Sequence, residues 1–341
     1  MLGYSDYASQ FPDLVKELLV FFSMSKMKKA EGKNALSPNT VGEFISYYKK
    51  NHSSTEHPAP RIATEICDKL CALNALHQIH KGYNDVSNSY LCMLKDNVET
   101  LPAQHREILL QRFECAVYGF TYIYERFQSL VVPIIHFTHE DDITIGTGFY
   151  WNGGIATAKH CLEGAKCIAI KDISKEQLNS ANIYISENIN MDLAFIDLKI
   201  RKQSLMISNS ALPRVLEEII TMGYPKIPGF THFQTVEKAT ISALPQKRFT
   251  ATTGSVAAVA PQVWVKENLF LITAKIRGGN SGGPVINSYG DIIGIVSEIP
   301  FAEGNYDDLG YGTAIPISFI IEIADKRQSM LSGMRFTDYV E

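Results

Sequence analysis

Hydrophobic residues recur at helical spacing through the first 130 residues of the chain. Thr40 and Glu43 have the spacing of a capping box and predict the start of one helix, and a wide apolar stripe from Gln104 to Gln128 predicts a long one. Two further apolar faces have members three or four positions apart, Val41, Phe44, Ile45 and Tyr48 in one and Ile62, Ile66, Leu70 and Leu73 in the other. We therefore expect residues 1–130 to form a mainly α-helical domain.

After Pro133 the pattern changes to short apolar runs, rich in Ile, Val, Thr and Phe, that Gly, Asn or Pro interrupts. The runs are Ile143–Phe149, Ile155–Ala158, Cys167–Ile170, Leu193–Leu198, Glu218–Gly223, Ala239–Ala243, Leu269–Ala274, Val285–Ile286, Ile292–Val296 and Gly312–Ile315. Many short strands of this kind are typical of a sandwich or barrel. Ser318 to Gln328 returns to helical spacing. We expect residues 131–341 to form an all-β domain with a C-terminal helix, so the chain is an α+β multidomain protein.

Composition excludes several classes of protein. The chain has 341 residues and 45% of them are hydrophobic, which suits two globular domains. The longest apolar runs, Leu18–Phe22 and Leu130–Ile135, are far shorter than the roughly 18 residues of a membrane span. The first residues show neither the basic leader nor the cleavage site of an export signal. We expect a cytoplasmic protein with no membrane partner.

The charge balance and the cysteines indicate which partners and cofactors to expect. Residues 1–130 carry 14 basic and 14 acidic side chains, and the rest carry 18 and 22, which together give the net charge of −4. Neither part has the basic excess of a nucleic-acid binder. The six cysteines include no Cys-x-x-Cys pair, so we expect thiols. Cys67, Cys71, His77 and His80 would not share one helix face, so we expect no metal and no other cofactor.

A glycine-dense turn in the β half holds the candidate nucleophile. Gly278 to Val285 places Ser281 among glycines, which leave room for a substrate chain. A serine hydroxyl becomes a strong nucleophile when an imidazole accepts its proton and a carboxylate holds that imidazole. All nine histidines precede Ser281, whereas an α/β-hydrolase needs its histidine after the serine. The remaining order is His, Asp, Ser.

Two segments supply the imidazole and the carboxylate. His160 follows the apolar run that begins at Ile155 and is the candidate base. Asp192 precedes an alternating apolar run and is the candidate orienting carboxylate. Asp197 lies five positions further on, so its side chain is expected on the opposite face.

Four segments in this order make the chain resemble the trypsin-like serine peptidases, in particular their HtrA-like intracellular branch. They are Gly146-Thr-Gly-Phe149, Thr157-Ala-Lys-His-Cys161, Asp192-Leu-Ala-Phe195 and Gly279-Asn-Ser-Gly-Gly-Pro284, and Gly223-Tyr-Pro225 also resembles a turn of HtrA-like members. The resemblance covers about residues 135–330. It implies two six-stranded antiparallel β-barrels, with His160, Asp192 and Ser281 as a catalytic triad in the cleft between them.

The resemblance also assigns substrate-binding groups. The backbone N–H groups of Gly279 and Ser281 would form the oxyanion hole. Lys275 would lie at the base of the specificity pocket, and Ser297 on the strand that pairs with the substrate backbone. An acidic substrate side chain would pair with Lys275, unless Glu298 neutralises the lysine and narrows the pocket toward small residues.

Two departures from secreted relatives bear on regulation. The stretch before His160 has no cysteine to bridge Cys161, so Cys161 is expected to be a free thiol. Asn280 stands where secreted zymogens use an aspartate, and the chain has no Ile-Val-Gly-Gly start. Activation by cleavage and insertion of a new N-terminus is therefore not expected.

Residues 37–95 resemble a degenerate winged helix. With no net charge, this half is expected to bind a regulatory protein or ligand and not nucleic acid. The sequence predicts a cytosolic serine endopeptidase that hydrolyses protein substrates and is regulated through its N-terminal domain. The alternative is an inert scaffold with a protease fold, or a DNA-binding regulator that uses the winged-helix-like domain.

Overall fold

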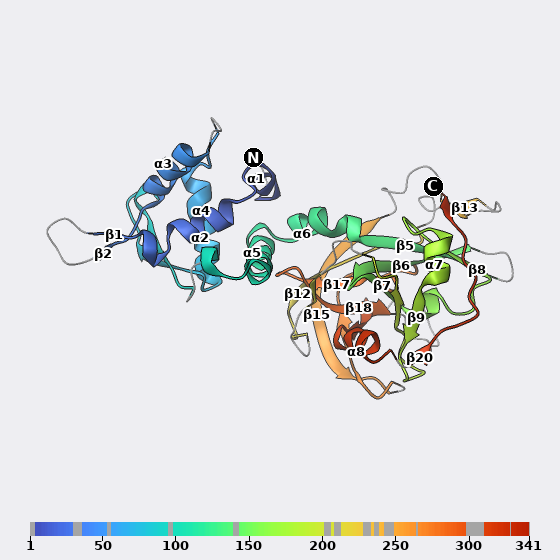
Figure 1. The fold of residues 1–341 in the computed structure, drawn as a ribbon. Helices are drawn as coiled ribbons and strands as arrows, with labels where there is room; N and C mark the ends of the chain where they lie inside the picture. Colours follow the sequence, from blue (N-terminus) through green and yellow to red (C-terminus); the bar gives the residue numbers. More distant parts are fainter. Residues whose placement is uncertain are drawn as a thin grey trace. The chain divides into compact units, whose positions relative to one another are not determined.

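A computed structural model gives the fold of the chain (Figure 1). It describes residues 4–29, 36–52, 56–94, 98–138, 143–200, 206–207, 213–227, 233–234, 239–241, 249–263, 265–297, 310–327 and 329–340. The chain divides into two compact units, residues 1–123 and 124–341.

The first unit is mainly helical. Its helices are α1 (Tyr4–Gln10), α2 (Leu14–Phe21), α3 (Val41–Asn51), α4 (Pro60–Ala72) and α5 (Ala103–Tyr118), with short 3-10 turns at Met24–Lys26, Asp85–Ser87 and Val98–Thr100. Two antiparallel strand pairs join them, β1 (Lys28–Lys29) with β2 (Leu36–Ser37) and β3 (Leu76–His80) with β4 (Ser89–Cys92). Phe22, Phe44 and Tyr90 are among the largest fully buried side chains of its core. The predicted helical domain is confirmed.

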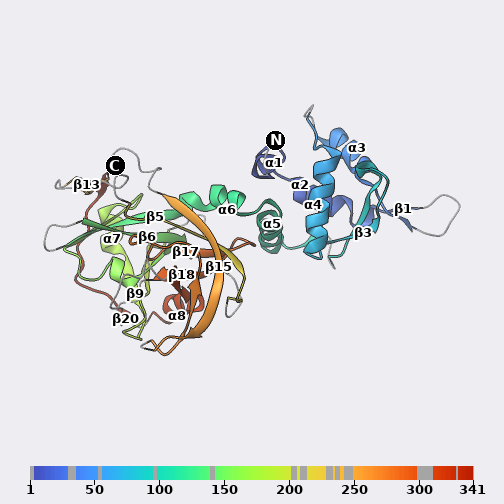
Figure 2. The same ribbon diagram turned by 180° about the vertical axis from the view of Figure 1, so that it is seen from behind.

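Local sequence signals set the helix boundaries in this unit. Thr40 caps α3 through the expected capping box, in which its side chain accepts from Glu43 and the Glu43 carboxylate accepts from the Thr40 backbone. Thr40 also forms a β-bridge with Ser89 on β4. The order of elements here is α2, β1, β2, the bridge at Thr40, α3, α4, β3 and β4, and Figure 2 labels α2, α3, α4 and β3.

The prediction of a single long helix from Gln104 to Gln128 is wrong. The structure has two helices, α5 ending at Tyr118 and α6 (Phe120–Phe127), because Gly119 adopts a φ of 81°. Glycine reaches this left-handed region without the steric cost that other residues meet there. The apolar stripe continued through this break, so periodicity alone did not reveal it.

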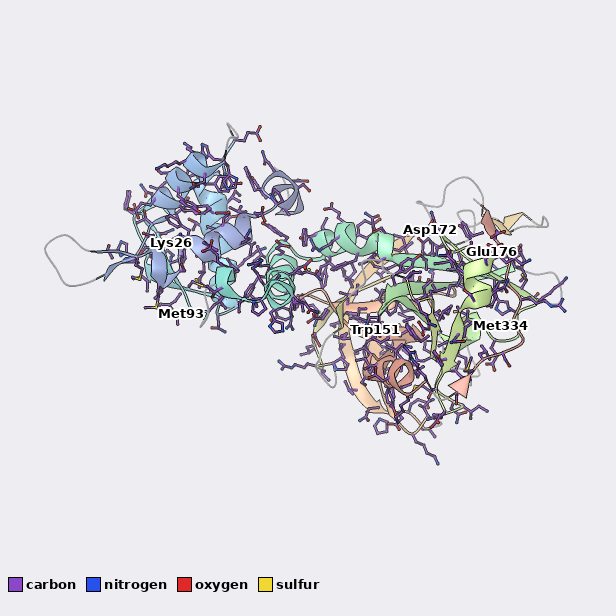
Figure 3. All side chains as sticks on the ribbon, in the orientation of Figure 1. Lys26, Met93, Trp151, Asp172, Glu176 and Met334 are labelled. Atoms are coloured by element: carbon purple, nitrogen blue, oxygen red, sulfur yellow. The ribbon has the colours of Figure 1, made fainter. Side chains whose placement is uncertain are left out.

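The first sheet of the second unit has the order β20-β9-β10-β7-β6-β5-β8. Its strands are β5 (Val131–Phe137), β6 (Ile143–Trp151), β7 (Gly154–Thr157), β8 (Cys167–Ile170), β9 (Asn182–Ile185), β10 (Ala194–Asp197) and β20 (Ser329–Met330), and α7 (Lys175–Ser180) links β8 to β9. Trp151, labelled in Figure 3, stacks edge-on against Phe195 at 5.3 Å between ring centroids.

The second sheet has the order β11-β18-β17-β12-β15-β16-β19, with an additional β18–β19 pairing. Its strands are β11 (Met206–Ile207), β12 (Glu218–Gly223), β15 (Thr250–Pro261), β16 (Asn268–Ile272), β17 (Pro284–Asn287), β18 (Asp291–Ser297) and β19 (Gly312–Pro316). The β18–β19 pairing closes six antiparallel strands into a ring. Separate short strands are β13 (Phe233–Gln234), β14 (Ala239–Ile241) and β21 (Tyr339–Val340). The expected chymotrypsin-like, two-barrel architecture is confirmed.

The C-terminal segment completes the first sheet. In the described strands β8 and β9 do not pair, and the chain after helix α8 (Ser318–Lys326) runs between their edges (Figure 1). β20 pairs with β9, and Phe336 forms a parallel bridge with Ile168 on β8. Phe336 is buried in the core of this sheet, and Met334, labelled in Figure 3, packs partly buried against it. The predicted C-terminal helix is confirmed, and the segment beyond it is part of the barrel.

Candidate active site

His160 and Asp192 come together because of the register between two strands. β7 and β10 are antiparallel, with Thr157 opposite Ala194. The residues that follow β7 therefore lie beside those that precede β10, and these are the 3-10 turn Lys159–Cys161 and Asp192. The imidazole Nδ1 of His160 is 2.7 Å from Oδ2 of Asp192, and the backbone N–H of His160 donates to Oδ1 at 2.9 Å. One carboxylate thus fixes both the ring and the backbone of the histidine.

A third donor reaches the same carboxylate. Ser297 ends β18 in the other sheet, and its hydroxyl donates to Oδ2 of Asp192 at 2.8 Å. The Asp192 side chain is only 12% exposed, whereas the imidazole of His160 is 42% exposed. A substrate can therefore reach the ring but not the carboxylate that holds it.

The electrostatics of the pair favour the imidazolium–carboxylate state. Burial acts to lower the pKa of His160, but the hydrogen bond to Asp192 and the charge of that carboxylate outweigh it and raise the pKa above the ordinary value. Burial acts to raise the pKa of Asp192, but its hydrogen bonds from His160 and Ser297 lower it. Asp192 therefore stays ionised and stabilises positive charge on His160.

Ser281 lies in the loop that backbone contacts hold against both sheets. Its carbonyl accepts from the backbone N–H of Thr147 at 2.9 Å and contacts Sγ of Cys161 at 3.4 Å. Gly282 N–H donates to the carbonyl of Val296 on β18. Ser281 therefore lies against the residue next to His160. Among the described residues its hydroxyl has no hydrogen-bond partner, and such bonds often form only when a substrate is bound.

The peptide groups of this loop have a definite orientation. The carbonyl of Gly278 accepts from the backbone N–H of Lys226 at 2.8 Å. In a trans peptide the C=O and N–H point in opposite directions, so the N–H of Gly279 points away from Lys226. Gly279 has a φ of 99°, and a Cβ there would lie 2.4 Å from the carbonyl oxygen of Tyr224. Only glycine fits this turn.

The structure describes only some of the residues expected in the specificity pocket. Lys275 is exposed, and its backbone carbonyl accepts from the hydroxyl of Thr252. Glu298 lies outside the described residues. Ile276 lies over Gly312, where a Cβ would be 2.4 Å from its Cγ1. An apolar side chain thus follows Lys275 in the expected pocket, and the sequence pattern gave no sign of its position.

Sequence reasoning also missed two hydroxyl contacts. It placed Ser297 beside the substrate, but not in a bond to Asp192, and it gave Thr147 no role. The Ser297–Asp192 contact joins positions 105 apart in the chain, and the contact from the Thr147 hydroxyl to Gly279 joins positions 132 apart. The only sequence signal for Thr147 was its place in the Gly146–Phe149 segment.

Comparison with known proteins agrees with this geometry. The family described as "Trypsin-like peptidase domain" matches residues 146–295, which include all three residues of the predicted triad. Residues 146–295 are therefore similar to a trypsin-like peptidase domain. Within the peptidase domain, the free thiol of Cys161 is buried against Gly146, and a Cβ at Gly146 would lie 2.4 Å from its Sγ. The Cys161 thiol expected from the sequence is confirmed.

Relatives of the peptidase domain are serine proteases. The chain is 30% identical over 171 residues to a probable periplasmic serine endoprotease DegP-like of Buchnera aphidicola, a match that covers 50% of this chain and 32% of the relative. It is 31% identical over 174 residues to the serine protease Do-like HtrB of Bacillus subtilis, which covers 50% and 35%. The chain thus spans about a third of the length of these curated relatives.

Solved structures with similar folds include the Rv3671c protease of M. tuberculosis in its active form. That similarity has 16% sequence identity and a TM-score of 0.46, and covers 63% of this chain and 88% of the other. Within the described part of this chain, no helix is long and apolar enough to cross a bilayer.

Proposed function

We propose that the chain is a serine endopeptidase that hydrolyses protein substrates through an acyl-enzyme. The observation that carries the proposal is the two-point contact between His160 and Asp192, beside a loop that presents Ser281. An imidazole held in one tautomer by a buried carboxylate is the arrangement that activates a serine hydroxyl.

Each residue then has one role in the reaction. Ser281 Oγ attacks the scissile carbonyl while Nε2 of His160 accepts its proton. Asp192 keeps the proton of His160 on Nδ1 and stabilises the imidazolium that forms. The N–H groups of Gly279 and Ser281 bind the oxyanion of the tetrahedral intermediate. His160 returns the proton to the leaving amine, and water repeats the sequence to release the acid.

A fluorophosphonate probe tests this proposal directly, because only an activated serine reacts with it. We expect the folded protein to be labelled at Ser281, as mapped by peptide mass spectrometry, and the heat-denatured protein to remain unlabelled. A folded protein that is never labelled would instead favour the inert scaffold or the DNA-binding regulator. The peptidase homologues favour the first reading.

Cleavage specificity is expected to depend on Lys275. Its ammonium group would pair with an Asp or Glu side chain before the scissile bond and would repel Lys or Arg. We therefore expect peptide-library profiling to show cleavage after acidic residues, and Lys275→Ala to remove that preference.

The position of Ile276 favours a different cleavage preference. Its side chain lies over Gly312, so the pocket would suit a small apolar substrate residue before the scissile bond. A profile dominated by Lys or Arg, or one that Lys275→Ala leaves unchanged, would show that Lys275 does not set the preference.

Regulation is proposed to act through the N-terminal unit, which would bind a regulatory protein or ligand. Its winged-helix-like order and its balance of 14 basic and 14 acidic residues up to residue 130 favour such a partner over DNA. We expect deletion of residues 1–123 to change the rate of fluorophosphonate labelling several-fold. An equal rate for the full chain and for residues 124–341 would contradict regulation by this unit.

We also propose that the protein acts in the cytoplasm. All six cysteines are free thiols, as is usual in a reducing compartment. The Buchnera relative is named as periplasmic, so fractionation of the native cells is the deciding measurement.

A further inference from the structure

Thr147 lies under the loop that carries Ser281. It belongs to β6 and is completely buried. Its hydroxyl donates to the carbonyl of Gly279 at 2.7 Å and accepts from the backbone N–H of Tyr224 at 3.0 Å. A single buried hydroxyl therefore joins the nucleophile loop to the segment that follows β12.

Both partners of this hydroxyl lie close in the chain to the peptides that carry, or that hold, the proposed oxyanion-hole N–H groups. The carbonyl of Gly279 belongs to the peptide after the proposed N–H donor. Tyr224 begins the short segment in which Lys226 N–H holds the carbonyl of Gly278, in the peptide that contains the Gly279 N–H. Thr147 thus holds the Gly279–Asn280 peptide directly. It holds the Gly278–Gly279 peptide indirectly, through the segment from Tyr224 to Lys226.

The backbone of Thr147 adds a third constraint. Its N–H donates to the carbonyl of Ser281 at 2.9 Å, which fixes the peptide after the nucleophile. Its own carbonyl accepts from the hydroxyl of Thr157 at 2.7 Å, so Thr147 itself is anchored to β7. The carbonyls of both proposed oxyanion-hole residues therefore bond to this one threonine.

Such constraints matter because glycine at position 279 leaves the loop free to rotate. Glycine at a φ of 99° has other backbone conformations available at low cost. A rotated peptide between Gly278 and Gly279 would aim a carbonyl where the N–H now points, and the oxyanion would meet a negative dipole. The bonds to Thr147 oppose that rotation.

We propose that Thr147 is a positioning residue whose hydroxyl holds the oxyanion hole in its competent orientation. The inference rests on the proposed peptidase function, although Thr147 touches no reacting atom. Its hydroxyl acts by holding the Gly279 carbonyl and the Tyr224 N–H, and it moves no proton in the reaction.

Fluorophosphonate labelling kinetics test this role without a known substrate, since the phosphoryl oxygen of the probe occupies the oxyanion hole. Thr147→Val keeps the shape but loses the hydroxyl, and Thr147→Ser keeps the hydroxyl. We expect Thr147→Val to lower the maximal labelling rate kinact by about tenfold to a hundredfold, below the 10²–10³ cost of removing a direct donor, with KI little changed. Thr147→Ser should label at close to the wild-type rate.

Thr221→Val is the matched control for buried hydroxyl loss. Thr221 is 3% exposed, and its hydroxyl bonds to that of Thr252 on β15, whereas that of Thr147 bonds to Gly279. Thr221→Val is expected to lower the thermal unfolding midpoint, as Thr147→Val does. Its kinact is expected to stay at the wild-type value. If Thr147→Val does not fold, Thr147→Cys keeps a weak donor of similar size and is expected to give an intermediate kinact.

The outcomes separate this inference from the proposed function. A folded wild-type protein that the probe never labels removes the proposed function itself. A labelled wild type with an equal kinact in Thr147→Val, or in Thr147→Cys where that variant is used, overturns the role of Thr147. A Thr147→Ser variant as slow as Thr147→Val also overturns it.

Discussion

Replacing Ser281 by alanine is expected to lower kcat by about 10⁶-fold, the order of loss that follows removal of the nucleophile from such a triad. The loop should keep its conformation, because the contacts of Ser281 with Thr147 and Cys161 use its backbone carbonyl. Hydrolysis of fluorescein-labelled casein measures the loss. The thermal unfolding midpoint should remain close to that of the wild type.

Ser255→Ala is the control for this substitution. Ser255 lies on β15, and its hydroxyl bonds with that of Thr273. It should leave turnover unchanged. Comparable casein hydrolysis by Ser281→Ala and wild type, at equal concentration of folded protein, would remove Ser281 from the mechanism.

Asp192→Asn is expected to lower kcat by about 10⁴-fold. The amide is the size of the carboxylate but can donate to Nδ1 of His160, which favours the tautomer that carries its proton on Nε2. That tautomer cannot accept the proton of Ser281. Steady-state hydrolysis of a peptide substrate, chosen from the library profile, gives the measurement.

The pH dependence of kcat/KM should change in a defined direction. His160 accepts a proton only when neutral, so activity rises as pH increases through its pKa. Burial acts to lower that pKa, but Asp192 outweighs it and raises the pKa, so the rising limb of the wild type is expected above pH 6.5, the ordinary value for histidine. Loss of the Asp192 charge should move this limb of the residual activity to lower pH.

Asp197→Asn separates this effect from simple loss of a buried carboxylate. Asp197 ends β10 and is buried, and its Oδ2 is 3.6 Å from the guanidinium of Arg327, whereas the ring of His160 bonds to Asp192. It is expected to change stability and leave the pH profile in place. A rising limb that is unmoved in Asp192→Asn would contradict the role given to that carboxylate.

The strand pattern could be predicted from the sequence because it depends on local features. Short apolar runs between Gly, Asn and Pro marked β8 and β12 with their observed bounds. The strand β15 gave no comparable signal, because its alanines, threonines and glycine are less apolar, and its side chains are mostly only half-buried. Gly119 ends α5 inside an unbroken apolar stripe. The sequence did not predict this end because a backbone conformation leaves no trace in the spacing of apolar side chains.

The sequence by itself determined the order of the candidate groups, His160, Asp192 and Ser281, and the glycine that the loop needs at position 279. Tertiary structure alone decided which groups hold them. Ser297 reaches Asp192, Thr147 reaches Gly279, and the C-terminal segment with Phe336 enters the first sheet. These contacts join residues more than a hundred positions apart, so they depend on strand register and on how the sheets pack. A local motif fixes the conformation of its own few residues, whereas side-chain contacts between distant segments exist only once the barrels have formed.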